Sequence, residues 1–492
     1  MKLTPKTFEI SSWIVAFSLS VGVLSVRAEE DFDFQPAKQW KAMTDAEFAA
    51  AMKGPEKAQR KIASSGKDLS DRSLSKELRE FRDKKIFALK TPDQIDALIT
   101  EVNANYASYP NDLKLVAAGI ALLKPAKGIL YRARPFVERT RALHSAVLSS
   151  LRQSISFYQT FFPTAQWGAV MTYLAEPTAE NVSRFRSEVD IQRYLANEVY
   201  PQLTLLAERI SALPADEPIP FDYKILYGNA SYPSDLDRYR TFGLPEKYST
   251  LAEIHQQTGA VSFLLAYRWT DFLRVNSAIG FLYGIDGFKN LVDGVQGAPA
   301  RDRVAVIKSF KSFLTLRDGK KGPDAMADAF NHFKESVRYS SLLWTSVKDR
   351  APDYQAFIDP GSLSFKTREI PLGIESRQRL VSGPTPVTSV ITNEKIKIDV
   401  PKFFSDPPKD LKDFLATDFQ AGSRELSMTV GGKTMKYRNY LEGSPSAWNL
   451  PLYRKYVIEG IATNADVPKA TRILGQEWGT DGIAKIFLNA VL

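Results

Sequence analysis

TLAEIHQQTGAVSFLLAYRWTDFLRVNSAIGFLY, residues 250–283, is the stretch that decides the fold class of this chain. It opens on Thr250-Leu251-Ala252-Glu253, the spacing of a capping box, in which the threonine and the acid satisfy exposed amides at a helix start. Arg268, Asp271 and Arg274 follow at helical spacing in its middle. Because charges there are costly in lipid, the stretch predicts one long buried helix rather than a membrane span.

Helical signals continue over most of the first two thirds of the chain. Thr44-Asp45-Ala46-Glu47 and Thr91-Pro92-Asp93-Gln94 are two further capping boxes. Apolar residues recur at three- and four-residue steps between Pro135 and Pro163, and again from Thr178 towards Leu213. Pro201 should split the second of these helices near Val199. No repeat of solenoid length recurs, so we expect an irregular helical bundle.

The pattern becomes alternating after Pro360. VTSVITNEKIKIDV, residues 387–400, reads as two short strands around Asn393-Glu394. ELSMTVGGKTMKY, residues 425–437, predicts a hairpin with a Gly-Gly turn that pairs Leu426 with Tyr437 and Met428 with Met435. The expected fold class is mostly α with a smaller α+β C-terminal region, an irregular helical bundle followed by short β-hairpins and terminal helices.

The N-terminal residues predict export. The apolar run from Trp13 to Val26 is shorter than the roughly 20 residues that a membrane span needs, and Val26-Arg27-Ala28 resembles a signal-peptidase site. We therefore expect a cleaved signal peptide (1–28), a charged N-terminal helical segment (29–110), a helical core domain (111–358) and a mixed α/β C-terminal region (359–492).

The composition limits the cellular location of the protein and the kinds of chemical site that it can form. The chain has 492 residues, a formal net charge of +9 and no cysteine. Disulfides, thiol nucleophiles and thiolate metal sites are therefore excluded. A large exported protein without disulfides is typical of a bacterial envelope. The expected location is thus periplasmic or extracellular.

A basic stretch indicates a binding partner. From Lys124 to Arg152 seven basic residues, which include Arg132, Arg134, Arg139 and Arg141, stand against Glu138 alone. Such a helix surface attracts an anionic envelope polymer or a membrane surface, and another envelope protein is the alternative partner. Basic clusters of this kind are, however, more often solvated helix faces. No nucleic acid is expected as a partner.

Catalytic motifs are weak. Ser73-Leu74-Ser75-Lys76 has the serine–lysine spacing of penicillin-recognising enzymes, but Met435 stands where their final glycine belongs. Glu477 and Asp481 in LGQEWGTDGI are the remaining candidates for a pair of carboxylates. His332 and Glu335 share a helix turn, but such a lone pair is more often a surface contact than a metal site.

Arg268 and Asp271 are interpreted as an internal salt bridge or as part of a polar ligand pocket. The sequence favours an exported, non-catalytic binding or scaffold protein that needs no cofactor and no metal. The alternative is a glycan-acting hydrolase of the cell envelope that uses paired carboxylates.

Overall fold

The computed structural model describes most of the chain. The described residues are 32, 34, 36, 42–53, 69–139, 164–175, 184–214, 217–227, 238–272, 274–275, 278, 300–347, 356, 358, 369–389, 392–420, 424–430, 433–439 and 445–477. The predicted fold class is confirmed, because long helices fill the first part of the described chain and short antiparallel strands gather mainly in the C-terminal part. Among the described residues, no helix combines the length and the apolar character needed to cross a bilayer.

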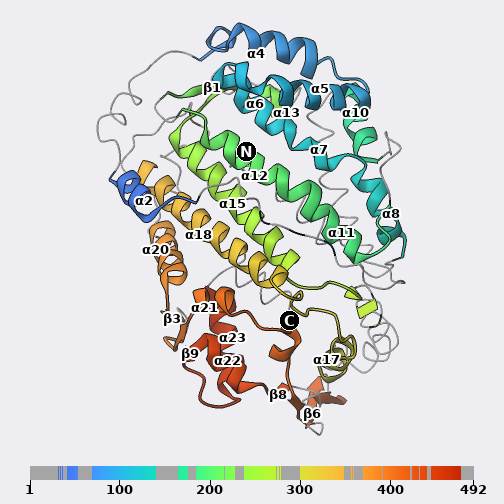
Figure 1. The fold of residues 1–492 in the computed structure, drawn as a ribbon. Coiled ribbons are helices and arrows are strands. Elements are labelled where there is room, and N and C mark those ends of the chain that lie inside the picture. The colour runs from blue at the N-terminus through green and yellow to red at the C-terminus, as the bar shows by residue number, and fades with distance from the viewer. Residues whose placement is uncertain are drawn as a thin grey trace.

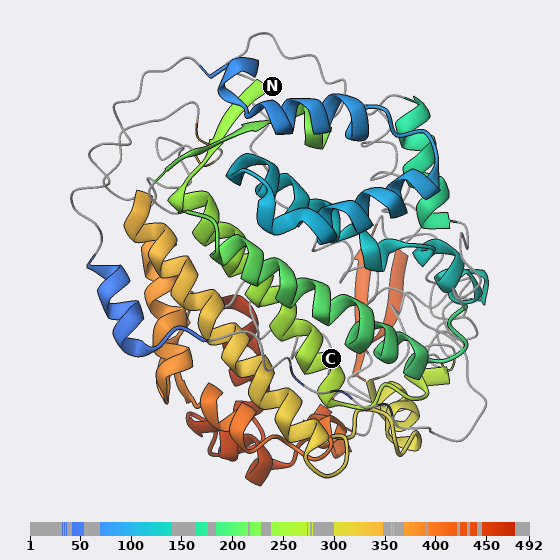
Figure 2. The same cartoon turned by 45° about the horizontal axis from the view of Figure 1, so that its top comes forward.

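Three helices form the centre of the molecule. They are α12 (Tyr200–Ser211), α15 (Leu244–Ala266) and α18 (Lys321–Val347), and they run side by side in Figure 1 and Figure 2. α15 packs along both of the others. The large buried apolar cluster of the protein draws on all three helices, so the core is built around α15.

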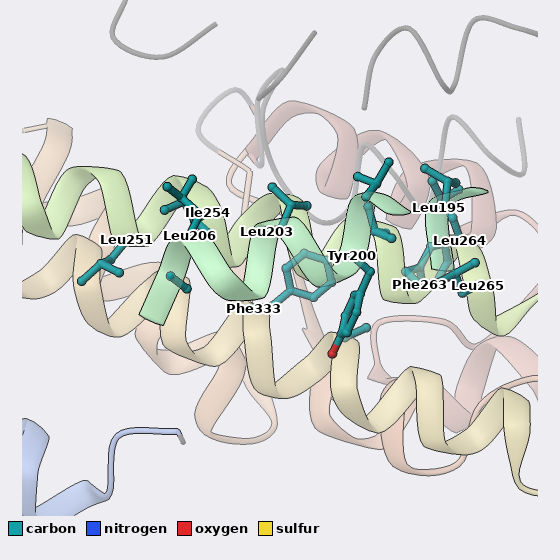
Figure 3. Packing of buried hydrophobic residues seen from close by; sticks show 14 of the residues in the cluster. Leu195, Tyr200, Leu203, Leu206, Leu251, Ile254, Phe263, Leu264, Leu265 and Phe333 are labelled. Atoms are coloured by element: carbon teal, nitrogen blue, oxygen red, sulfur yellow. The ribbon is translucent and has the colours of Figure 1, made fainter. Parts of the chain in front are cut away.

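α15 and α18 approach closely and run antiparallel. A Cβ atom on Gly259 would lie 2.9 Å from Cε1 of Phe333 and 3.1 Å from the carbonyl oxygen of Ala329. Only a residue without a side chain fits that approach. Figure 3 shows Phe333 of α18 packed among apolar side chains of α12 and α15.

Pro201 has the effect that the sequence predicts. α11 (Glu188–Tyr194) leads into the π-helical segment η4 (Leu195–Val199), and α12 begins directly after it with the proline in its first turn. The proline lacks an amide and crowds the preceding turn, which explains the wider turn just before it. The helix starts ten residues later than the predicted Thr178.

The helix predicted for residues 250–283 is wrong at both ends. It begins at Leu244, where Glu246 accepts a hydrogen bond of 2.9 Å from the amide of Gly243, so Thr250 lies inside the helix. It ends at Ala266, because Tyr267 is extended and bridges to Leu316. The apolar pattern continues beyond that point, and tertiary contacts end the helix.

A layer of shorter elements covers the top and the right side of the core in Figure 1. Its helices are η1 (Asp71–Ser73), α4 (Lys76–Phe81), the π-helical η2 (Arg82–Ile86), α5 (Pro92–Asn105), η3 (Tyr106–Ser108), α6 (Asn111–Ala121), α7 (Leu123–Ala126), α8 (Ile129–Arg139), α10 (Thr164–Ala175) and α13 (Lys224–Tyr227). The hairpin of β1 (Ile219–Asp222) and β2 (Tyr239–Phe242) joins this layer.

Two of the predicted helix starts are confirmed. Thr44 caps α2 (Asp45–Met52) with a complete capping box, and Thr91 starts α5 with Pro92 in the first turn. α8 begins six residues before the predicted start at Pro135. The apolar stripe predicted beyond it, at 147–162, lies outside the described residues.

Most of the remaining elements are short and lie at the bottom of Figure 1. They are α17 (Ala300–Ser309), α20 (Glu369–Ser382), β3 (Thr385–Thr388), β4 (Lys395–Ile398), α21 (Val400–Ser405), η5 (Leu411–Phe414), β5 (Asp418–Phe419), β6 (Arg424–Val430), β7 (Lys433–Asn439), β8 (Pro445–Ala447), α22 (Leu450–Tyr456), β9 (Val457–Glu459) and α23 (Asp466–Glu477).

The strand predictions hold in this part. β3 and β4 form the predicted pair, and β9 adds a third strand to them. β6 and β7 pair in the predicted register, Leu426 with Tyr437 and Met428 with Met435. The turn residues 431–432 and the side chains of this hairpin lie outside the described part of the chain.

Candidate functional site

The basic stretch forms part of a surface on α8. Arg134 is exposed there. Arg132 is half-buried, makes a two-pronged ion pair with Glu198 of η4 at 2.7 and 3.2 Å, and lies over the ring of Tyr194. Arg132 therefore fixes α8 against η4.

A second segment places further arginines next to α8. The amide of Phe185 donates a hydrogen bond of 2.9 Å to the carbonyl oxygen of Arg132, which places residues 184–186 beside α8. Arg184 lies over the ring of Tyr131, 4.8 Å from its centre, and Arg184 and Arg186 are both exposed. We call Arg132, Arg134, Arg184 and Arg186 the basic surface.

The sequence did not predict the contribution of residues 184–186. About fifty residues separate them from α8, and contacts made only in the folded chain bring them together, among them the backbone hydrogen bond of Phe185 and the ring contact of Arg184. Acidic residues also reach this region, because Lys127 pairs with Asp96 of α5 and Arg132 with Glu198. Glu138 is thus not the only acid that offsets the basic stretch.

Two other predicted binding residues lie outside the described side chains. Arg139 is the last residue of α8, and its backbone alone is described. Arg141 lies outside the described residues. The expected role of both stays a prediction.

Arg268 and Asp271 do not pair with each other. Arg268 binds Asp318 at 2.5 Å, and Asp271 binds Arg274 at 2.8 Å, three residues on. Both lie beyond the end of α15, and Asp271 has a φ of 68°, so neither belongs to a continuous buried helix. Asp271 and Arg274 form a local ion pair at a partly exposed turn, which is not the buried salt bridge within a helix that the sequence predicted.

The candidate catalytic carboxylates remain untested. Glu477 is the last residue of α23, and its side chain lies outside the described part; Asp481 lies outside the described residues altogether. The structure therefore gives no distance between the two carboxyl groups, which is the quantity that differs between retaining and inverting glycosidases.

A buried polar cluster lies between the three central helices. Asp328 of α18 accepts hydrogen bonds from the hydroxyls of Tyr200 (2.9 Å) and Ser262 (2.6 Å). Nδ1 of His332, one turn further on, lies 2.9 Å from Nδ1 of His255 of α15. In Figure 3 the hydroxyl of Tyr200 points from its helix towards α18. We call these five residues the polar cluster.

The histidine prediction is wrong in one respect. His332 and Glu335 share a helix turn as expected, but they are 1% and 2% exposed and are not surface contacts. The sequence carried a partial signal, because Asp328, His332 and Glu335 recur at four- and three-residue steps on one face of α18. The partner His255 lies 77 residues away and could not be found that way.

Burial keeps both imidazoles neutral. It lowers the pKa of His255 to about 4. Burial, together with the neighbouring His255, lowers the pKa of His332 to about 2. Neutral imidazoles are good metal ligands, but no group of three suitable side chains gathers within the described residues. With its hydroxyl and carboxylate groups bonded to one another, the polar cluster joins the helices.

A second buried network connects the upper layer to β1. Asp222, fully buried, accepts from Arg82 at 2.8 Å and from two nitrogens of Arg238 at 2.9 and 2.8 Å. Burial alone would lower the pKa of Arg82, but hydrogen bonds to Asp83 and Asp71 and the charge of Asp222 raise it above its ordinary value. Arg82 thus stays charged and ties η2 to the hairpin.

Comparison with known proteins gives no relative. No family model, no curated protein and no solved structure matches the chain.

Proposed function

We propose that the protein is an exported, non-catalytic binding protein of the bacterial envelope whose ligand is an anionic polymer. The observation that supports this most directly is the basic surface, where exposed arginines lie on α8 and on residues 184–186 beside it. Guanidinium groups suit carboxylates and phosphates, because they offer paired donors to two oxygens of either group.

The surface favours a polymer over a lipid bilayer. Proteins that bind a membrane surface combine basic residues with apolar side chains that enter the lipid. Among the described residues, the large apolar side chain that is exposed is Ile458, and it lies on β9 and not on the basic surface. Charge alone supports binding to a chain of anions. Physiological salt screens this electrostatic attraction beyond about 8 Å.

Co-sedimentation with purified peptidoglycan tests this proposal. We expect retention at low salt and release at about 1 M salt, where the screening length falls to about 3 Å. For the variant Arg134→Ala plus Arg186→Ala, the amount of protein retained on peptidoglycan should fall at least fivefold. Arg274→Ala plus Arg301→Ala, which removes two exposed arginines elsewhere, should bind as the unchanged protein does.

Equal retention of both double variants would contradict a role for the basic surface. Phosphatidylglycerol liposomes form the second arm of the experiment. Retention on these liposomes without retention on peptidoglycan would replace the polymer by a lipid surface and overturn the proposal.

A further inference from the structure

Arg209, in the last turn of α12, is a buried cation. The residue is 8% exposed, and no ion pair joins it to a carboxylate of the described residues. Other buried arginines have such partners, because Arg82 pairs with Asp222 and Arg338 pairs with Glu335. A charge that is taken out of water is costly unless an opposite charge offsets it. In the described part of the chain, the charge of Arg209 is therefore not offset.

Two neutral side chains hold the guanidinium of Arg209 in place. Its Nη2 donates a hydrogen bond of 2.7 Å to Oδ1 of Asn103, near the end of α5. The ring of Tyr106 lies against it, with 4.3 Å between the ring centre and Cζ, and the hydroxyl of Tyr106 donates to the carbonyl oxygen of Arg209 at 3.3 Å. Nη1 is also buried and has no hydrogen-bond partner within the described ranges. One donor of the fork thus lacks an acceptor.

The end of α12 does not supply the missing negative charge. Carbonyl groups at a helix C-terminus favour a nearby cation, but Lys247, 9% exposed, already donates to the carbonyl oxygens of Ser211 (2.8 Å) and Leu213 (2.5 Å). Burial lowers the pKa of Lys247. It also lowers the pKa of Arg209, although Tyr106 and the neighbouring glutamate act against it. Two buried cations therefore meet one helix end.

The geometry of the fork indicates which ligand fits. Nη1 and Nη2 together bind two oxygens of one carboxylate or phosphate group side by side. In the structure, Oδ1 of Asn103 takes the place of one such oxygen on Nη2. A water molecule would satisfy Nη1 but would leave the charge of Arg209 as it is. An oxyanion would satisfy both nitrogens and offset the charge.

The fork lies directly beneath the protein surface. Asn103 is exposed and Tyr106 is half-buried. Exposed side chains change rotamer within nanoseconds, so the amide of Asn103 can turn aside and admit an anion to Nη1 and Nη2. The amide nitrogen of Asn103 can then donate to the bound anion.

We propose that Arg209, with Asn103 and Tyr106, binds an oxyanion of a ligand, a carboxylate or a phosphate group, where the end of α5 meets α12. The site is separate from the basic surface, whose arginines lie on α8 and on residues 184–186. It therefore goes beyond the proposed binding of a polymer.

Thermal denaturation of the full chain tests the proposal. Sodium chloride is replaced stepwise, at constant ionic strength, by sodium acetate or by sodium phosphate. We expect the midpoint to rise by about 1–2 °C at about 50 mM of the anion and then to level off, because the folded protein alone binds it. A rise with acetate assigns a carboxylate, and a rise with phosphate alone assigns a phosphate. No saturable rise with either anion would overturn the proposal.

The substitution Asn103→Asp is the decisive variant. It places a carboxylate oxygen where Oδ1 of Asn103 now accepts from Arg209. The midpoint in chloride should rise by about 1–2 °C, and the response to acetate and phosphate should disappear. Asn105→Asp is the matched control, because it adds the same charge at the same end of α5, where the Asn105 amide donates to the carbonyl oxygen of Glu101.

The variants also separate a specific site from general effects of the salt. Phosphate stabilises many proteins without binding them at one place, and such an effect would persist in Asn103→Asp. A response that is kept in Asn103→Asp or in Arg209→Met, or lost in Asn105→Asp, would overturn the proposal. Arg134→Ala plus Arg186→Ala should leave the response unchanged, so failure of the polymer proposal is distinguishable from failure of this one.

Discussion

Single positions in the contact between α15 and α18 limit the size of the side chain, which the amino-acid composition does not reveal. Gly259→Ala places a methyl group 2.9 Å from Phe333 Cε1 and 3.1 Å from a backbone oxygen. Because the backbone cannot yield as a flexible side chain would, we expect the free energy of unfolding to fall by about 1–3 kcal/mol. Urea denaturation measures it.

Gly119→Ala is the matched control for that substitution. Gly119 is an exposed position of α6, and no atom lies within 4 Å of a Cβ built there. Alanine should raise the free energy of unfolding by about 0.5–1 kcal/mol through its better helix propensity. A loss at both glycines would contradict the close-approach argument.

Asp222 is the second position where one side chain decides stability. Asp222→Asn leaves Arg82 and Arg238 without their shared buried charge. We expect a loss of about 3–5 kcal/mol in the free energy of unfolding. Asp83→Asn removes a more exposed partner of the same Arg82 and should cost less than about 1 kcal/mol.

At the scale of elements, local signals predicted the structure and long-range contacts overrode them. The capping boxes at Thr44 and Thr91 and the hairpin register at 426–437 depend on residues close in sequence, and they hold. The helix at 250–283 failed because Tyr267 pairs with Leu316, far along the chain. Apolar periodicity cannot report such a contact.

The same limit applies to the candidate site. The sequence identified Arg132 and Arg134 from the density of basic residues, but residues 184–186 join them only through the fold. Likewise, helical spacing in the sequence places the residues of the polar cluster on one face of each helix. The contact between His255 and His332 depends on how α15 and α18 pack.

The end of α15 gives a prediction at this scale. Gln192 of α11 donates to the carbonyl oxygens of Leu264 (2.9 Å) and Tyr267 (2.7 Å), where the helix stops. Gln192→Ala should lower the free energy of unfolding by about 1–3 kcal/mol, because a buried carbonyl loses its donor. Thermal and urea denaturation measure this loss.

Gln257→Ala is its control. Gln257 lies on the same α15 but donates to Glu253 one turn away, in a partly exposed pair. We expect a change of no more than about 0.5 kcal/mol. A similar loss in both variants would contradict a specific role of the Gln192 amide at the end of α15.

At the scale of the whole molecule, the helices are joined by polar groups as well as by the apolar core. The polar cluster links α12, α15 and α18, and the network at Asp222 links the upper layer to β1. Such groups are costly to bury unless they are satisfied. A change of protonation inside the core should therefore change the stability of the entire body.

The buried histidines make that dependence measurable. Their pKa values in the folded protein are lowered, to about 4 for His255 and about 2 for His332, whereas unfolded histidine binds a proton near pH 6.5. Below that pH the unfolded chain therefore binds more protons, and stability falls as pH falls. Glu335, whose pKa burial raises, contributes with the opposite sign and offsets part of this loss. Between pH 7.5 and 5.0 we expect the free energy of unfolding to drop by about 2–4 kcal/mol.

The double variant His255→Gln plus His332→Gln should show a much flatter dependence in urea denaturation at the two pH values. Carboxylates with lowered pKa values, such as Asp71 and Asp406, lose their contribution only at lower pH, so they do not mask the difference. An equally steep fall in the double variant would assign the dependence to other groups.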